Sequence, residues 1–514
     1  MNDQIRLAEL LGSLSFAGDL GRGQPMGHVL RTARVAMALA DRLRVPTAQM
    51  ADVYYTSLLM HAGCTAGSAE FAAFLASDDL SAQKDFCLCD PNNLGQLFGW
   101  LRRNVAKGQP LPARTLRMLQ LISKGEKAFQ DIDQGCSEVG SRIAARLGMS
   151  EATELSLYHI CETWNGKGPH KLKGEDIPLA GRIVNVAMIL EVFFSERGVA
   201  AARDAAIARK GMSFDPTVSD AAIALCGEDG FWGVMREREP WVLVLELEPQ
   251  PVRYVAESSV DEFCYALADI VDLKATTAAT HSRRTAELAE GIAQRLRLSS
   301  DDTVLTRRAA LVHDVGLVAV PSLLLERGQS WSETDFERFR LHTYYTERIL
   351  SRSEHLKSIG AVASGHHENT DGSGYHRGVS GNQFPIAARI VAAASAYAEA
   401  GSSLPDDTVA PERILSTLRA QRRLDPDCLT ALAAEVGSPE RVSAIRLAWP
   451  AGLTEREVEV LRLVALGLNL RETAARLVIS GHTARHHLES IYSKAGVSSR
   501  AGAVLFAVEN SLLR

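Results

Sequence analysis

The chain has 514 residues, an apolar fraction of 46%, a charged fraction of 23% and a formal net charge of −6. These values are typical of a globular protein of about three domains, and they exclude wholesale disorder, a collagen-like chain and a long coiled coil. No apolar run reaches the ~18–20 residues of a membrane span, and the eight cysteines are mostly isolated. We therefore expect a cytoplasmic protein without a membrane segment or a disulfide framework.

Helical periodicity dominates the sequence from its first third onward. Val35, Leu39 and Leu43 share one helix face, and stripes of this kind recur along the chain. The best strand candidate is Trp241–Leu247, which stands beside a proline-containing joint at 248–251. A second joint lies at 449–452. We therefore predict a mostly α protein with domains at 1–250, 251–448 and 449–514.

The sequence repeats itself once. Gly166–Lys171 resembles Gly372–Arg377, and each segment is followed by a proline and then by Arg-Ile-Val. Upstream, His28 matches His281 and His61 matches His313. The spacing between the copies shrinks after His61, so the first copy carries about 46 extra residues before Glu162. These matches predict two tandem helical domains that have diverged from one ancestor.

Histidines and one vicinal aspartate gather in the second copy, in the order His281, His313-Asp314, His342 and His366-His367. Imidazole and carboxylate ligands suit divalent metals such as Mn, Fe, Co or Zn. An apolar helix at 309–312 precedes His313-Asp314, and Gly316 is expected to terminate it. A single histidine is more often a surface or core residue, but this ordered set favours a metal site in which Asp314 bridges two ions.

These motifs resemble those of the HD-GYP branch of HD-domain metal phosphohydrolases, over residues 270–430. The resemblance implies an all-helical fold, two or three divalent transition metals, with Mn or Fe favoured, and hydrolysis of cyclic dinucleotides. It implies His313 and Asp314 as the catalytic pair, and as metal ligands it implies His281, His313, Asp314, His342, His366 and His367. It also implies a nucleotide pocket lined by Asp371, Gly372, Gly374, Tyr375 and Arg377.

Several positions depart from the family pattern. Leu317 replaces a phosphate-binding lysine, and Ser395 and Ala398 stand where the family carries aspartates. Thr277 stands where some members have a glutamate ligand, and His376 replaces a proline. Because a serine hydroxyl does not ionise readily, one metal position is predicted to be damaged. Weak activity and a purely ligand-sensing role both remain open.

The first copy retains His28 and His61 but lacks most of the pattern. By the sequence match, Ala62 takes the place of the aspartate, Ile160-Cys161 replaces the histidine pair and Met188 takes the later aspartate position. We expect no metal site here. A structural or dimerising domain is the main hypothesis, and a ligand-sensing pocket is the alternative.

The last sixty residues predict three short helices joined by tight turns. Thr454 and Glu457 form a capping box, and the helix that follows buries Val458, Leu461 and Ala465 before Gly467 ends it. A second helix covers 472–477. Ser480 caps a third helix, which turns three apolar residues inward at i, i+4 and i+7, namely Ala484, Leu488 and Ile491.

This arrangement resembles the LuxR-type helix-turn-helix, whose members bind double-stranded DNA and commonly dimerise. The resemblance implies a four-helix DNA-binding domain with its recognition region at 480–490. Candidate DNA-contacting residues are Ser480, Thr483, Arg485, His486, Lys494 and Arg500. Arg485 is suited to a bidentate guanine contact, although Glu489, one turn later, could pair with it instead.

Two functions follow from these features. The first is a homodimeric transcription regulator whose HD-GYP-like domain senses a nucleotide or a metal and moves the DNA-binding domain. The second is an active metal-dependent cyclic-dinucleotide phosphodiesterase coupled to DNA binding. A metal-dependent phosphomonoesterase is a third, weaker hypothesis.

Overall fold

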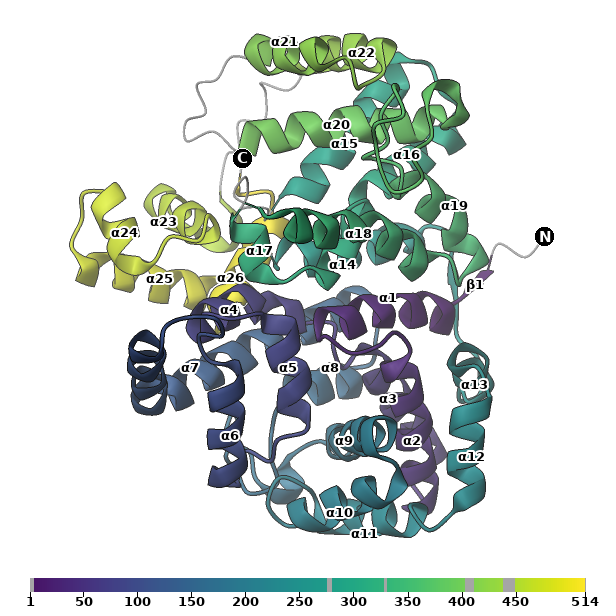
Figure 1. Ribbon diagram of the computed structural model, residues 1–514, viewed down its shortest axis with the longest axis vertical. Coiled ribbons are helices and arrows are strands. Elements are labelled where there is room, and N and C mark those ends of the chain that lie inside the picture. Colours follow the sequence, from purple (N-terminus) through teal and green to yellow (C-terminus); the bar gives the residue numbers. More distant parts are fainter. Residues whose placement is uncertain (1–3, 275–279, 328–330, 403–410, 438–448, 514) are drawn as a thin grey trace. The chain divides into compact units, whose positions relative to one another are not determined.

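The computed structural model describes the whole chain except residues 1–3, 275–279, 328–330, 403–410, 438–448 and 514. Its elements are almost all helices, as predicted, and they form two compact units (Figure 1). The first unit comprises Met1–Ser259 and Pro321–Leu325, and the second comprises Val260–Val320 and Glu326–Arg514. None of the described helices combines the length and the apolarity that crossing a membrane requires.

The first unit contains the two strands of the described chain, β1 (Gln4–Arg6) and β2 (Tyr254–Ala256), which pair antiparallel with Ile5 opposite Val255. Its helices are α1 (Leu7–Gly21), α2 (His28–Arg42), α3 (Thr47–Leu59), η1 (Cys64–Gly67), α4 (Ser68–Leu75), α5 (Asp79–Cys87), α6 (Leu94–Asn104), α7 (Leu111–Arg146), α8 (Glu151–Tyr158), η2 (Gly174–Asp176), α9 (Leu179–Arg197), α10 (Val199–Arg209), α11 (Pro216–Leu225), α12 (Asp229–Glu237) and α13 (Pro240–Glu246).

The second unit begins with the helices that carry the histidine set. They are α14 (Ser259–Asp272), α15 (His281–Arg295), α16 (Ser300–Val312), η3 (Val315–Ala319), α17 (Ser322–Arg327, most of which clusters with the first unit), α18 (Glu333–Leu350), α19 (Glu354–Ala363), η4 (Gly381–Gln383), α20 (Ile386–Ser402), α21 (Pro411–Gln421) and α22 (Pro426–Val436). The C-terminal helices are η6 (Pro450–Gly452), α23 (Glu455–Ala465), α24 (Leu470–Arg476), α25 (Gly481–Ala495) and α26 (Arg500–Glu509).

Helix lengths establish the register of the internal repeat. Helices α2 and α15 both have 15 residues and begin at His28 and His281, and α3 and α16 both have 13 residues. The residue that follows α3 is Met60, and the residue that follows α16 is His313. Met60 therefore occupies the position of His313, and His61 occupies that of Asp314. The predicted match of His61 with His313 was wrong by one residue, because it followed residue type rather than helix register.

The extra residues of the first copy form helices α4, α5 and α6 and part of the 36-residue helix α7. The described residues of the corresponding stretch in the second copy form only η3 and α17 before α18 begins. The added helices have a core of their own around the buried Trp100, whose indole N–H donates to the carbonyl of Ala82 at 3.0 Å. The insertion thus extends the first unit without interrupting the repeat.

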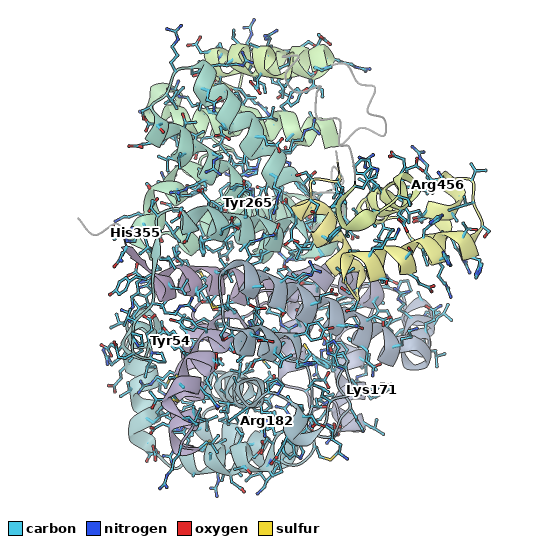
Figure 2. All side chains as sticks on the ribbon, turned by 180° about the vertical axis from the view of Figure 1, so that it is seen from behind. Tyr54, Lys171, Arg182, Tyr265, His355 and Arg456 are labelled. Atoms are coloured by element: carbon cyan, nitrogen blue, oxygen red, sulfur yellow. The ribbon has the colours of Figure 1, made fainter. Side chains whose placement is uncertain are left out.

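The strand predicted at Trp241–Leu247 is wrong, because this segment is helix α13. A short apolar run does not distinguish a strand from a buried helix. Two residues favour the helix. Pro240 lies in the first helical turn, and the side chain of Glu239 caps the helix by accepting the N–H of Trp241 at 2.8 Å. The fully buried Tyr54, labelled in Figure 2, donates its hydroxyl to the carbonyl of Val244 and holds α13 in place.

The C-terminal helices confirm most of the local predictions. The capping box of Thr454 and Glu457 opens α23, and α25 begins after the Ser480 cap. The second helix begins two residues earlier than predicted, because Asn469 and Glu472 form another capping box. The core includes the three residues predicted to face inward from α23, together with Ala484 and Ile491 from α25.

Candidate metal centre and nucleic-acid interface

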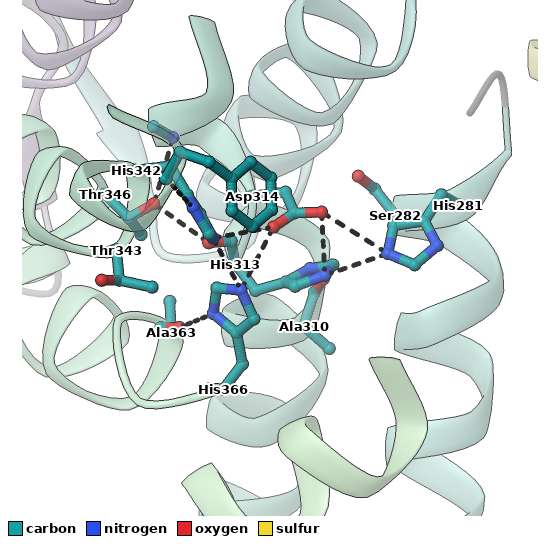
Figure 3. Close-up of polar contacts among 12 residues, drawn as sticks. His281, Ser282, Ala310, His313, Asp314, His342, Thr343, Thr346, Ala363 and His366 are labelled. Atoms are coloured by element: carbon teal, nitrogen blue, oxygen red, sulfur yellow. Dashed lines mark hydrogen bonds and ion pairs between the residues drawn. The ribbon is translucent and has the colours of Figure 1, made fainter. Parts of the chain in front are cut away.

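Asp314 lies between two groups of histidines in the second unit (Figure 3). Its Oδ2 atom is 3.5 Å from Nε2 of His281 and 3.3 Å from Nε2 of His313. Its Oδ1 atom is 3.2 Å from Nε2 of His366 and 3.6 Å from Nε2 of His342. One carboxylate oxygen therefore faces each group, which is the arrangement that a carboxylate bridging two metal ions needs.

All six residues implied as ligands converge on this centre. They form two sets whose ligand atoms lie within 4.8 Å of one another, His281 with His313 and Asp314, and His342 with His366 and His367. His281 is the first residue of α15, His313 follows the last residue of α16, and His342 lies within α18. Three helices and the segment after α19 thus contribute to one buried cluster.

Backbone carbonyls orient the imidazole rings. Nδ1 of His313 donates to the carbonyl of Ala310 at 2.8 Å, and Nδ1 of His366 donates to that of Ala363 at 2.8 Å. His342 makes the same bond three residues back along its helix. Because a carbonyl only accepts, Nδ1 must carry the proton, which leaves the Nε2 lone pair toward the centre. Metal-binding histidines are commonly held in this way.

The donor set fits divalent metal ions. Nε2 of His342 and Nε2 of His366 lie 3.2 Å apart, and two facing lone pairs at this distance repel unless a cation or a proton stands between them. Burial lowers the pKa of His313 to about 3 and that of His342 to about 4, so both rings are neutral near pH 7. Burial opposes ionisation of Asp314, but the surrounding histidines hold its pKa well below its ordinary value. Neutral imidazoles and a carboxylate are the forms that bind metals.

Gly316 brings η3 against α18, and it is not the helix terminator predicted from the sequence. A Cβ atom at this position would lie 1.9 Å from the carbonyl oxygen of His342. Thr346 completes the contact, because its hydroxyl donates to the carbonyl of His313 and accepts the N–H of Gly316, both at 3.0 Å. This close approach places His342 beside the His313-Asp314 pair.

The loop expected to line a nucleotide pocket is fixed to the histidine pair. Glu368, which follows His367, accepts the backbone N–H groups of Arg377 at 2.7 Å and Val379 at 3.1 Å. Tyr375 stacks on His367 with ring centroids 4.8 Å apart. Asp371 accepts the N–H and the hydroxyl of Ser373, and Arg377 pairs with Glu347. Gly374 approaches the backbone of His367 closely, whereas the described contacts of Asp371 and Gly372 lie within the loop and its neighbours.

Two of the departures lie on elements that pack against the helices of the ligands. Ser395 is buried on α20, at the position where the family carries an aspartate, and Leu317 lies in η3 directly after Gly316. Thr277 lies outside the described residues. His376, which replaces a proline, is 3.4 Å from Glu347 through Nε2. A hydroxyl and a leucine side chain therefore stand in place of one carboxylate and one ammonium group.

Glu399 is a carboxylate at this site that the sequence analysis missed. It lies one helical turn after Ser395 on α20 and reaches solvent. The pKa of its carboxyl is raised to about 7, mainly because the surrounding protein desolvates it. The negative charge of Asp314 adds to this rise, and the charge of His366 opposes it. The i, i+4 spacing to Ser395 is the signal that could have identified it, because that spacing places both residues on one helix face.

The recognition helix α25 presents polar side chains to solvent. Thr483, Arg485 and His486 are exposed, whereas Ala484 between them is buried. Ser480 uses its hydroxyl as the helix cap and accepts the N–H of Thr483 at 3.0 Å. Within the described chain the Arg485 guanidinium forms no ion pair, so the alternative pairing with Glu489 is not formed.

Lys494 and Arg500 serve contacts inside the domain. Nζ of Lys494 is 2.7 Å from the carboxylate of Glu457, and the Arg500 guanidinium donates to the carbonyls of Val464 and Leu468 at 2.7 and 3.1 Å. These bonds engage both cations within the domain while Lys494 is also exposed, and their place beside DNA phosphates stays a prediction. The exposed residues of α25 therefore extend from Thr483, Arg485 and His486 to Glu489 and Lys494.

Comparisons with known proteins match both regions of the second unit. A family model described as an HD domain matches residues 265–428, and one described as bacterial regulatory proteins of the luxR family matches 451–507. The chain is 30% identical over 431 residues to the 3′3′-cGAMP-specific phosphodiesterase 3 of Vibrio cholerae, a match that covers 83% of this chain and 94% of that protein. This chain belongs to the HD-GYP family. It also carries a LuxR-type DNA-binding domain.

Further relatives place both units within the HD-GYP family. The cyclic di-GMP phosphodiesterase response regulator RpfG of Xanthomonas campestris is 34% identical over 154 residues, which are 29% of this chain and 41% of that protein. A crystal structure of a cyclic GMP-AMP specific phosphodiesterase from V. cholerae superposes with a TM-score of 0.59 and 26% identity, covering 85% of this chain and 99% of that one. A match over 85% of the chain is longer than either unit, so it includes residues of the first unit as well as the second.

Proposed function

We propose that this chain is a DNA-binding transcription regulator whose HD-GYP domain holds two divalent transition metal ions and binds a cyclic dinucleotide. The observation that carries the proposal is the position of Asp314, with one oxygen toward each histidine group. We propose domain boundaries at 250/251 and 448/449, a homodimer as the DNA-binding form, and a cytoplasmic location.

The proposed metal ligands divide around Asp314. One ion, Mn or Fe by preference, would be held by His281, His313 and Asp314, and the other by Asp314, His342, His366 and His367. When bound, such ions lower the pKa of water and polarise a phosphodiester. Hydrogen bonds from the histidine Nδ1 atoms to buried backbone carbonyls fix the tautomer in which Nε2 is free to bind a metal ion.

The proposed ligand class rests on the loop after the histidine pair and on the relatives. Tyr375 stacks on His367, and Arg340 lies over the Tyr375 ring at 5.3 Å, so an aromatic face and a cation adjoin the metal centre. Such surfaces suit a purine base and a phosphate. The relatives named above act on 3′3′-cGAMP or cyclic di-GMP, and we extend this class to the present chain.

Hydrolysis of the bound dinucleotide is the finer part of the proposal. The two ligand sets and their neutral imidazoles favour turnover. Leu317 and the buried Ser395 favour the second candidate, a sensor that binds its ligand without cleaving it. Glu399 lies one turn from Ser395, and in an active enzyme it would supply the missing carboxylate.

A joint measurement of metal content, hydrolysis and DNA binding tests the proposal. Full-length protein is purified anaerobically without chelator, its metals are counted, and 3′3′-cGAMP and cyclic di-GMP are tested as substrates and as effectors of promoter binding. Two metals with turnover support the enzyme. Metal or nucleotide binding that shifts promoter affinity without turnover supports the sensor. Absence of metal uptake and of any nucleotide effect would overturn both.

A further inference from the structure

Two histidines and one glutamate of the first unit meet at the C-terminal end of α8. His159 follows the last residue of α8, Glu162 lies three residues later, and His170 belongs to the loop that comes next. One ligand atom from each of the three side chains lies within 4.8 Å of the other two. Nδ1 of His170 is 3.3 Å from Oε1 of Glu162. Ligand atoms held about 2.0–2.2 Å from one tetrahedral Zn²⁺ ion are about 3.4 Å apart, so this set has the dimensions of a metal site.

The ring nitrogens that face this cluster are buried and have no hydrogen-bond partner. This holds for Nδ1 of His159 and for both ring nitrogens of His170 among the described residues. The approach of His170 to Glu162 does not satisfy Nδ1, because the contact lacks the geometry of a hydrogen bond. Buried polar atoms in native proteins are nearly always paired, and an ion or a water molecule accounts for most exceptions. Three open nitrogens beside one carboxylate therefore indicate a cation.

The two imidazole rings are arranged like a pair of ligands of one ion. The centroids of His159 and His170 are 5.1 Å apart. In the second unit, His281 and His313, which share one ligand set, also have centroids 5.1 Å apart. Tyr158 stacks on His170 at 4.6 Å and meets the His159 ring at 5.0 Å and 86°. Tyr158 thus limits the orientations of both rings.

Glu162 retains the capacity to bind a cation while it holds the loop. Its side chain is fully buried, and its two oxygens accept the backbone N–H groups of His170 at 2.6 Å and Leu172 at 3.0 Å. A carboxylate has about four acceptor sites, so each oxygen keeps one in reserve. No lysine or arginine among the described residues forms an ion pair with Glu162. Because a buried carboxylate needs a compensating charge, a metal ion is the partner that fits this place.

The described residues of the second copy form no equivalent cluster at the matching position. Glu368 accepts backbone N–H groups of its own loop as Glu162 does, so Gly365, three residues before Glu368, occupies the position of His159. A Cβ atom on Gly365 would lie 1.8 Å from the ring of Phe384, which leaves no space for an imidazole. The cluster is therefore specific to the first copy and is not a remnant of the ligand pattern around Asp314.

We propose that His159, Glu162 and His170 bind one Zn²⁺ ion in the first unit. Imidazole and carboxylate donors suit Zn²⁺, and three protein ligands leave one coordination position for water. The His170 side chain is 13% exposed, so the cluster borders on solvent and an ion can enter. The ion joins the end of α8 to the loop at 163–172. The site is independent of the Asp314 centre and of the proposed enzyme activity, and it stands in a domain where the sequence led us to expect no metal.

Hydrogen exchange of the wild-type full chain, with and without added Zn²⁺, tests the site without any substitution. We expect Zn²⁺ to slow exchange of the backbone amides in 158–174, because the ion fixes the loop to α8. Zn²⁺ at the Asp314 centre acts on different peptides, around 313–316 and 366–379, which mass spectrometry resolves separately. No uptake of Zn²⁺, or uptake that leaves exchange in 158–174 unchanged, would overturn the proposal.

Substitutions then count the ion. Competition titration of the full chain against a chromophoric chelator gives the Zn²⁺ bound per chain, and His159→Gln/His170→Gln should lose one equivalent relative to wild type. Glu162 is left unchanged, because it holds the loop. His355→Ala, which removes an exposed imidazole of α19, is the matched control and should bind as wild type does.

Thermal unfolding without metal shows first whether the double variant is folded, and where it is not, the exchange experiment on the wild type decides. In the folded double variant, Zn²⁺ should no longer slow exchange in 158–174. Equal Zn²⁺ content and equal exchange in the wild type and the double variant would overturn the site and leave buried water as the partner of the open nitrogens.

Discussion

Nζ of Lys494 lies 2.7 Å from the carboxylate of Glu457, which joins the recognition helix α25 to α23. Glu457 also accepts the N–H of Thr454 at 2.7 Å and the hydroxyl of Ser490 at 2.6 Å. Burial opposes its ionisation, but these partners lower its pKa to about 2 from an ordinary value of 4.5. The carboxylate is therefore charged throughout the neutral range and fixes how α25 is presented.

The first prediction concerns this carboxylate. Because the folded pKa is depressed, the stabilisation is complete above pH 4.5 and is lost progressively as the pH falls toward 2. Glu457→Gln should destabilise the DNA-binding domain by about 1–2 kcal/mol at pH 7, since a capping box and two further bonds weaken. It should also flatten the acid dependence. Hydrogen exchange of α23 and α25 in the full chain measures both effects. Glu489→Gln, at an exposed position of α25, should change neither.

The second prediction concerns Asp314. Asp314→Ala removes the carboxylate shared by both ligand sets. Loss of a residue that only hydrogen-bonds to a metal ligand lowers metal affinity by ~10–100-fold, and we expect loss of this ligand itself to lower it further. Hydrolysis of a generic phosphodiester should disappear. Elemental analysis and a phosphodiester assay check this, with the exposed Asp301→Ala on α16 as control. Hydrolysis by wild type but not by Asp314→Ala rejects a pure sensor, and unchanged hydrolysis in both rejects the proposed centre.

Local signals made the histidine cluster and the helix-turn-helix predictable. Thr454 and Glu457 satisfy each other's backbone groups within one turn, so their pattern is legible in the sequence alone. The order of the histidines and Asp314 along the chain was equally informative, because so many metal-ligating side chains in one ordered set rarely serve another purpose. The fold class followed from helical periodicity, which each helix carries within itself.

Features set by packing were not predictable. The apolar run of α13 alone is typical of a strand. The Glu239 cap and the hydrogen bond from Tyr54, which identify it as a helix, are known only from the structure. The register of His61 depends on the length of α3, which residue types do not reveal. No sequence motif marks Glu399, and its link to Asp314 is apparent only from the effect of that charge on the pKa of its carboxyl. The bond between Lys494 and Glu457 joins residues 37 apart in the sequence, so no local pattern announces it.

The third prediction concerns the α20 face of the metal centre. Ser395→Asp should raise metal occupancy or phosphodiesterase activity, because it restores a carboxylate at a buried position of α20, the helix that packs against α15 and α16. Glu399→Gln should lower metal occupancy, because it removes the carboxylate one turn away. Both effects are measured by metal titration of the full chain. Ser416→Asp on the exposed face of α21 is the control for added negative charge. If neither variant changes metal binding, another residue supplies the ligand and the register after Arg389 is wrong.

The fourth prediction concerns Arg485, whose guanidinium is exposed on α25 and forms no ion pair in the described chain. A bidentate contact to guanine is worth about 1–3 kcal/mol of discrimination, so Arg485→Ala should weaken promoter binding by that amount and leave non-specific DNA binding nearly unchanged. Competition binding at physiological salt, with specific and scrambled DNA, separates the two. Lys494→Ala is the informative comparison. Because Lys494 is held by Glu457, its loss should lower the stability of the domain more than it changes the discrimination between sequences. Retained promoter affinity in Arg485→Ala would remove Arg485 from the base-reading set and leave Thr483 and His486 as the candidates.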